Sequence, residues 1–185
     1  MLQFHDIHAR FGEKEVLHGV TLTLRPHRLT VILGRNGSGK STLLRCLNQE
    51  IPYTGTICEG EKNLALLGPR ERARTVAILP QTMPAPHITA WEMAALGRTP
   101  YLDLTGRMSP KDREAVNRAL TDADAVQLAD RFVDTMSGGE RQRVSLAMIL
   151  AQNTPIAALD EPTAHLDQSY EAAFLRQLRA IMQSR

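Results

Sequence analysis

The sequence is poor in several features that mark particular classes of protein. Its 185 residues include only two cysteines, Cys46 and Cys58, without metal-ligand spacing, which argues against a disulfide framework or a zinc module. The net charge of +2 is too small to indicate nucleic-acid binding by itself. No apolar run approaches the roughly 20 residues of a membrane span, and no signal peptide opens the chain. With 43% hydrophobic residues, these absences predict a soluble, cytoplasmic, globular domain.

The stretch 34–42 fits the phosphate-binding pattern G-x-x-x-x-G-K-[ST], the P-loop. Its glycines let successive backbone N–H groups point at one anion, Lys40 supplies a point charge for the terminal phosphates, and the Ser41 hydroxyl is an oxygen ligand suited to Mg²⁺. The apolar run 29–33 before it is predicted as a buried strand, and residues 40–48 as a helix whose N-terminus favours phosphate. The predicted nucleotide site comprises Gly34, Asn36, Gly37, Ser38, Gly39, Lys40, Ser41 and Thr42.

The remaining chain alternates strand and helix signals. Residues 2–24 indicate β structure, with Phe11 in a turn, where it is either a core residue or a platform for a nucleotide base. Residues 53–57 and 75–79 are predicted as further strands. Residues 84–135 are predicted as a helical insertion between two strands of the phosphate-binding core.

Helix starts are marked inside and after the insertion. Thr89 is a predicted N-cap for residues 90–96, with Gly97 as the stop. Ser109, followed by Pro110 and an acid, predicts a helix that runs to about residue 123. The last helix carries apolar residues at helical spacing, namely Tyr170, Phe174, Leu178 and Ile181.

Two further motifs have the chemistry of a phosphate site. Ser137, Gly138 and Gly139 stand where a helix begins, as an anion-binding turn or a plain helix cap. The apolar strand 155–159 ends in two carboxylates, of which Asp160 suits Mg²⁺ and Glu161 suits a general base. Gln81 follows strand 75–79 after Pro80, and its local sequence alone gives little reason to assign it to the site.

Together these motifs resemble those of the ATP-binding cassette (ABC) family. Residues 34–42 match its Walker A motif, and residues 156–160 resemble Walker B with smaller central residues. Residues 136–140 resemble the LSGGQ signature, with Met for Leu and Glu for Gln. The resemblance covers essentially the whole chain, residues 1–185, as one ATPase domain. It implies an α/β fold: a P-loop NTPase core with a mainly parallel sheet, an N-terminal antiparallel β subdomain and an inserted helical subdomain.

The resemblance also implies roles for residues that local patterns leave open. Gln81 becomes the Q-loop glutamine, which contacts Mg²⁺ and the transmembrane partner. Asp167 becomes the D-loop acid, and Phe11 the aromatic that stacks on adenine. The implied mechanism is a head-to-tail dimer of identical or paired ABC subunits, in which residues 137–139 of one chain cap the ATP bound to Walker A of the other.

Looser patterns resemble the importers of iron–siderophore, haem or cobalamin type. They are residues 95–101, the helix that starts at Ser109, and residues 129–131. This resemblance implies a peripheral subunit on the inner face of the cell membrane, with permease subunits as partners, a substrate-binding protein acting indirectly, and no nucleic acid.

Two alternatives remain at this point: a soluble non-transport ABC ATPase, and a truncated nucleotide-binding remnant. ABC domains continue into another strand and a switch histidine, and all six histidines of this chain precede that place; His165, in the D-loop, cannot serve. We therefore expect the 185-residue form to fold and turn over less well than one extended by about 60 residues, toward the usual domain size.

Overall fold

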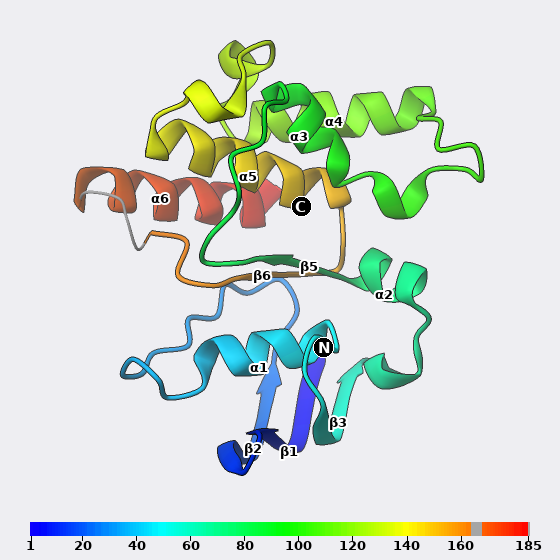
Figure 1. Cartoon of the computed structure of the whole chain (residues 1–185), viewed down its shortest axis with the longest axis vertical. Helices are drawn as coiled ribbons and strands as arrows, with labels where there is room; N and C mark the ends of the chain where they lie inside the picture. The colour runs from blue at the N-terminus through cyan, green and yellow to red at the C-terminus, as the bar shows by residue number, and fades with distance from the viewer. Residues whose placement is uncertain (164–167, 185) are drawn as a thin grey trace. The chain divides into compact units, whose positions relative to one another are not determined.

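A computed structural model describes residues 1–163 and 168–184. It contains two compact units, one formed by residues 1–72 with the last residues from 182 on, and one formed by residues 73–181 (Figure 1). Among the described residues, no helix is both long and apolar enough to cross a bilayer.

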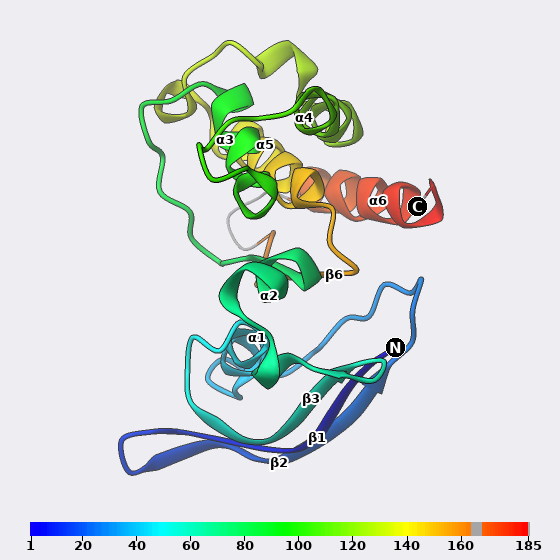
Figure 2. The same ribbon diagram turned by 90° about the vertical axis from the view of Figure 1, so that its right-hand side faces the viewer.

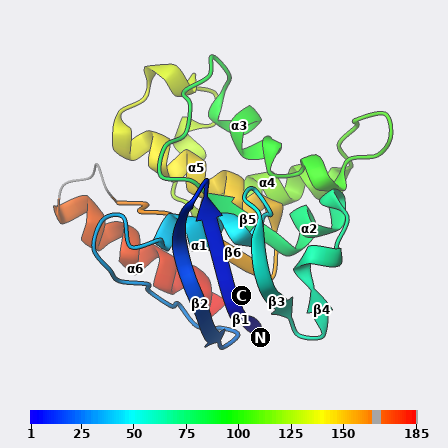
Figure 3. The same cartoon turned by 60° about the horizontal axis from the view of Figure 1, so that its bottom comes forward.

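The first unit is built on an antiparallel sheet with the strand order β2-β1-β3-β4 (Figure 3). One face of β1 is apolar at alternate positions, where Leu2 and Phe4 are buried, and Ile57 of β3 is buried beside them. The predicted N-terminal β structure is confirmed. The strands are β1 (Leu2–Phe11), β2 (Lys14–Leu24), β3 (Tyr53–Glu59) and β4 (Lys62–Asn63).

Strand β1 is bulged at Asp6, which has a left-handed φ of 51°. The register of β1 shifts around this point against both neighbouring strands: between Phe4 and Ile7 against β2, and between His5 and His8 against β3. Gly55 of β3 passes so close that a Cβ there would lie 2.3 Å from the Asp6 carbonyl oxygen. The bulge turns the Asp6 carboxylate toward His8, two residues along the strand.

The ring of His8 lies between two carboxylates, with Nδ1 2.8 Å from Glu15 Oε1 and Nε2 3.1 Å from Asp6 Oδ1. Both nitrogens can donate only in the imidazolium form, and the hydrogen bond to Glu15, with a smaller contribution from Asp6, raises the pKa of His8. A pKa raised on folding stabilises the fold below the unfolded value of about 6.5, and this stabilisation is lost as pH rises through the folded value.

We therefore expect the unfolding free energy to fall as pH rises above about 6.5. His8→Gln should remove that part of the pH dependence, while His5→Gln, at an exposed position of the same strand, should retain it. Denaturant unfolding followed by far-ultraviolet circular dichroism at a series of pH values makes the comparison. An unchanged pH dependence in His8→Gln would contradict the assignment.

Residues 29–33, predicted as a buried strand, are irregular in the structure, so this prediction was wrong. Leu33 is 87% exposed and Val31 64% exposed. A strand needs a neighbour to accept its ladder hydrogen bonds, and no strand in the described part of the chain pairs with this segment. The apolar, β-branched composition is a propensity only, which tertiary pairing decides. The helical elements of this unit begin with α1 (Lys40–Leu47), as predicted, and continue with η1 (Leu64–Leu66). The helix α2 (Pro69–Thr75) begins in this unit and ends in the second.

The second unit contains a parallel pair of strands and a helical core. The strands β5 (Val76–Leu79) and β6 (Ile156–Leu159) pair in register, Val76 with Ile156 and Leu79 with Leu159. The main helices pack side by side (Figures 1 and 2) around buried residues that include Met93, Val116 and Leu146. The helices are α3 (Ala90–Leu96), η2 (Thr99–Tyr101), α4 (Pro110–Asp122), η3 (Val126–Leu128), η4 (Val133–Thr135), α5 (Gly138–Gln152) and α6 (Gln168–Ser184).

The predicted helix starts are confirmed. Thr89 and Ser109 each form a capping box with the acid three residues later, Glu92 and Asp112. Gly97 ends α3 with a right-handed φ of −58°, so a left-handed turn is not the reason for glycine there. A Cβ at Gly97 would lie 2.2 Å from the Met148 carbonyl oxygen of α5; glycine lets the two helices approach.

Candidate functional site

The loop 34–39 is a tight turn that opens into α1. The Ser38 N–H donates to the Arg35 carbonyl over 3.1 Å and closes the turn. Gly37 and Gly39 have left-handed φ values of 78° and 94°, which favour glycine. A Cβ at Gly39 would also come within 2.8 Å of Leu17. Backbone conformation therefore favours glycine at both positions, and close packing favours it also at Gly39.

Lys40, the first residue of α1, folds its side chain back over the loop. Its Nζ donates to the carbonyls of Gly34 and Arg35, at 3.0 and 3.2 Å. Gly39 caps the helix without a side chain, and no acidic residue lies in the first turn. An anion at this helix end meets the positive end of the dipole and no carboxylate of α1. Ser41 and Thr42 follow in that first turn, half-buried and buried respectively.

Phe11 ends β1 beside a turn in which Gly12 has a left-handed φ of 59°. Its side chain is 47% exposed, which excludes the core position that sequence reasoning left open. An exposed aromatic ring in the same unit as the P-loop fits a stacking role.

In the second unit, the ends of β5 and β6 bring together residues that are far apart in the sequence. The Gln81 amide donates to Glu161 Oε2 over 2.8 Å, and the Asp160 N–H donates to the Leu79 carbonyl over 2.9 Å. Parallel strands end at the same edge of a sheet, which explains the meeting. Gln81, which had little local weight, lies against the carboxylate predicted as the base.

The two adjacent carboxylates have different surroundings. Asp160 is buried with 7% exposure, and Glu161 is half-buried. Glu161 has a left-handed φ of 46°, a conformation that costs a non-glycine residue about 1–3 kcal/mol and that clusters at functional sites. The chain therefore leaves β6 by a strained turn at the residue whose carboxylate contacts Gln81.

The turn before α5 is a capping box rather than a bare glycine turn. The Ser137 hydroxyl donates to Glu140 Oε2 over 2.9 Å and accepts the Glu140 N–H at 3.3 Å, and the Ser137 N–H donates to the same carboxylate over 2.8 Å. Sequence reasoning treated Glu140 only as a mild departure from the signature. The S-x-x-E spacing of a capping box could have identified it.

The predicted site residues fall into both units. The P-loop and Phe11 belong to the first, while Gln81, Asp160, Glu161 and the turn 137–139 belong to the second. Asp167 lies outside the described residues.

The predicted magnesium ligands have suitable donor chemistry. Ser41, Gln81 and Asp160 offer a hydroxyl, an amide carbonyl and a carboxylate, which are the hard oxygen donors that Mg²⁺ prefers; the ion usually keeps few protein ligands and completes its shell with water and phosphate. A dedicated all-protein metal cluster is not found among the residues that the structure describes.

Comparison with protein families identifies the class. Residues 17–164 match the family model described as "ABC transporter", and the chain therefore belongs to the ABC transporter family, as the motifs indicated. Solved ABC proteins share the fold: the ADP-bound cassette MJ1267 superposes with a TM-score of 0.87 at 22% identity, over 100% of this chain and 77% of that one. cbiO1 from Clostridium perfringens gives 0.85 at 24% identity, over 99% and 74%. The predicted α/β fold class is confirmed.

Curated relatives narrow the resemblance within the family. The "Probable siderophore transport system ATP-binding protein YusV" of Bacillus subtilis is 41% identical over 89% of this chain and 61% of its own length. The "Hemin import ATP-binding protein HmuV" of Pseudomonas fluorescens Pf-5 is 41% identical over 97% of this chain and 72% of its own length. The chain thus spans about 61% of the first of these relatives. The resemblance to ATP-binding proteins of siderophore and haem import is confirmed.

Proposed function

We propose that the chain is the ATP-binding and ATP-hydrolysing subunit of a membrane importer for iron–siderophore, haem or cobalamin. The observation that carries the proposal is the loop 34–39, which the Ser38–Arg35 hydrogen bond closes and which leads into an N-terminus of α1 without a side-chain cap. The names of the relatives support the transport role and the class of substrate.

Each predicted residue has a role that its chemistry suits. Lys40 and the loop N–H groups hold the β- and γ-phosphates, and Phe11 stacks on adenine. Ser41, Asp160 and Gln81 would hold Mg²⁺, which neutralises charge on the phosphates when bound. Glu161 orients water and accepts its proton, while the Gln81 amide fixes one of its carboxylate oxygens.

The assembly we propose is a head-to-tail dimer, with this chain paired with itself or with a second ABC subunit. Ser137, Gly138 and Gly139 of one subunit cap the ATP bound to the other, and Asp167 is assigned as the D-loop acid by the family resemblance. Permease subunits bind the pair at the inner face of the cell membrane, and a substrate-binding protein delivers the cargo from the other side.

A second candidate is a nucleotide-binding remnant with little ATPase activity. The exposed segment 29–33 favours it, because the residues that lead into the P-loop have no strand partner among those described. ATP binding without phosphate release, when the permease is present, would identify this form.

Lys40→Ala tests the site itself. Loss of the ammonium removes a charge-assisted contact to the phosphates, so the Kd for ATP with Mg²⁺ should rise by about tenfold or more. Isothermal titration calorimetry measures the change. Lys62→Ala is the matched control, since Lys62 is exposed in the same unit and makes only a 3.9 Å ion pair. Equal affinity of Lys40→Ala and the parent would disprove the assignment.

A further inference from the structure

Glu140 is held from two sides in the turn before α5. Its Oε2 accepts from the backbone and hydroxyl of Ser137, and its Oε1 accepts from Arg131 Nη1 at 2.5 Å. The hydrogen bonds from Ser137, reinforced by Arg131, lower the pKa of Glu140 to about 2. The carboxylate is therefore charged at neutral pH and stands directly against the hydroxyl of Ser137.

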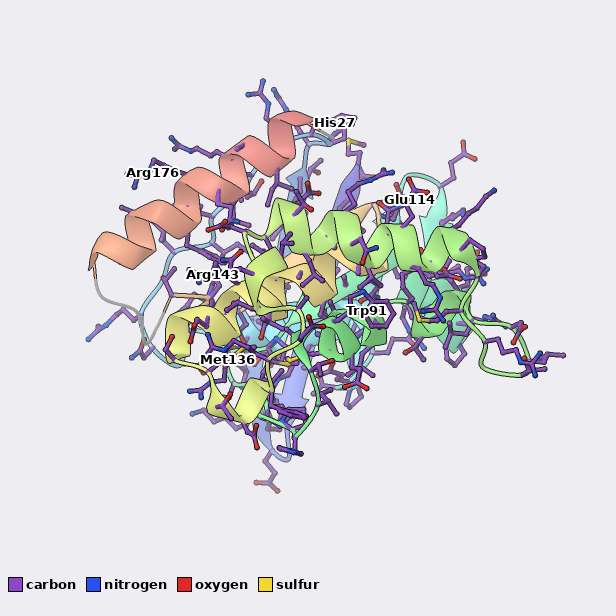
Figure 4. The ribbon with its side chains drawn as sticks, turned by 90° about the horizontal axis from the view of Figure 1, so that it is seen from above. His27, Trp91, Glu114, Met136, Arg143 and Arg176 are labelled. Atoms are coloured by element: carbon purple, nitrogen blue, oxygen red, sulfur yellow. The ribbon has the colours of Figure 1, made fainter. Side chains whose placement is uncertain are left out.

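Arg131 is itself fixed by the segment before the turn. Its carbonyl accepts the Ala90 N–H, and the Ala129 carbonyl accepts the Trp91 N–H, both over 2.9 Å. The N-terminal end of α3 is thereby tied by backbone bonds to residues 129–131. Residues 129–131 thus contact the start of α3 through their backbone and α5 through the Arg131 side chain. Figure 4 shows Trp91 on α3 and Met136 just before α5.

This arrangement creates an electrostatic conflict if Ser137 is to bind phosphate. A carboxylate within hydrogen-bond distance of the serine repels an incoming anion, and it also accepts the hydrogen bond that the serine hydroxyl could donate to a phosphate. Arg131 is the cation that contacts the same carboxylate, at its other oxygen. Of this ion pair, Arg131 is 47% and Glu140 22% exposed, so the arginine lies on the more open side.

We infer that Arg131 is a positioning residue for Ser137: it neutralises the charge of Glu140, so that the Ser137 hydroxyl can turn to a phosphate. The inference rests on the proposed function, in which Ser137 caps the ATP of the partner subunit. A signature with Glu at position 140 therefore needs Arg131 to offset the carboxylate charge next to Ser137, whereas one with a neutral Gln would not.

The test uses the full chain in a Glu161→Gln background, with ATP and Mg²⁺, and measures self-association by sedimentation velocity. Arg131→Met should weaken the ATP-dependent dimer by about tenfold, on the scale of one charged contact. Glu140→Gln alone should change it little. The double variant Arg131→Met with Glu140→Gln should return to within about threefold of the background, because the uncompensated charge is gone. Arg131→Lys, which keeps the charge, should retain most of the association.

Two controls separate positioning from folding. Arg118→Met breaks an exposed ion pair with Glu114 on α4 and should leave the dimer unchanged. ATP affinity of each variant, measured by calorimetry, should match the background, because the P-loop of the same chain is untouched. Should Arg131→Met fail to fold, Arg131→Gln keeps a hydrogen-bond donor without the charge and allows the same comparison.

The outcomes are distinguishable. No ATP-dependent dimer in the Glu161→Gln background overturns the proposed arrangement, and the inference falls with it. A dimer that Arg131→Met does not weaken, or that Glu140→Gln fails to restore, overturns the inference alone.

Discussion

Glu161→Gln is expected to lower ATP turnover by about 10²–10⁴-fold, the range of a general base, with little change in ATP affinity. Glutamine keeps the shape of the side chain and can still contact Gln81, but it cannot accept a proton from water. The substitution should not disturb the ends of β5 and β6, because the amide oxygen of a glutamine at position 161 can still accept the hydrogen bond from Gln81. Closed, ATP-loaded dimers should therefore accumulate.

Phosphate release by the chain, assembled with the permease subunits proposed above, measures the effect, and size-exclusion chromatography with light scattering detects the dimer. Glu114→Gln is the matched control, because Glu114 is an exposed carboxylate on α4. Turnover at the parental rate in Glu161→Gln would mean that another group accepts the proton, and the roles of Asp160 and Glu161 would have to be reassigned.

Short sequence patterns predicted the helix starts and the P-loop turn correctly, because both depend on residues that are close together in the sequence. The capping residues Thr89 and Ser109 specify helix starts through hydrogen bonds that span only three residues, so the sequence displays the whole interaction. The left-handed glycines of the P-loop are equally local. These elements were predicted with nearly correct bounds.

Interactions between distant segments could not be predicted in this way. Residues 29–33 have the composition of a strand, but pairing depends on a neighbour that local sequence does not show. Gln81 and Glu161 meet across 80 positions, so only the family resemblance gave Gln81 a role. Arg131 was noted only as part of the pattern 129–131, without a role: its contact with Glu140 spans nine positions, outside the three- and four-residue spacings of a single helix.

The second unit contains a buried ion pair between α4 and the turn after α3. Arg98 donates through Nε and Nη2 to Asp112 Oδ1, at 3.0 and 2.9 Å, and through Nη1 to the Ala151 carbonyl at 2.8 Å. The two side chains are only 10% and 8% exposed. The Ser109 hydroxyl and backbone bind the other carboxylate oxygen, and with Arg98 they lower the pKa of Asp112. Arg98 also stacks 3.8 Å from the centroid of the Tyr101 ring.

Arg98→Met is expected to destabilise the second unit by about 3–5 kcal/mol, because it leaves a buried carboxylate without its cation. Arg98→Met with Asp112→Asn should cost less than the single change, since the uncompensated charge is gone and Asn can still accept from Ser109. Trp91 is the only tryptophan and lies in this unit on α3, so its fluorescence during urea unfolding follows this unit selectively. Arg118→Met, in an exposed pair, should cost at most about 0.5 kcal/mol. If Arg98→Met shifts the transition no further than Arg118→Met, the buried pair does not support this unit.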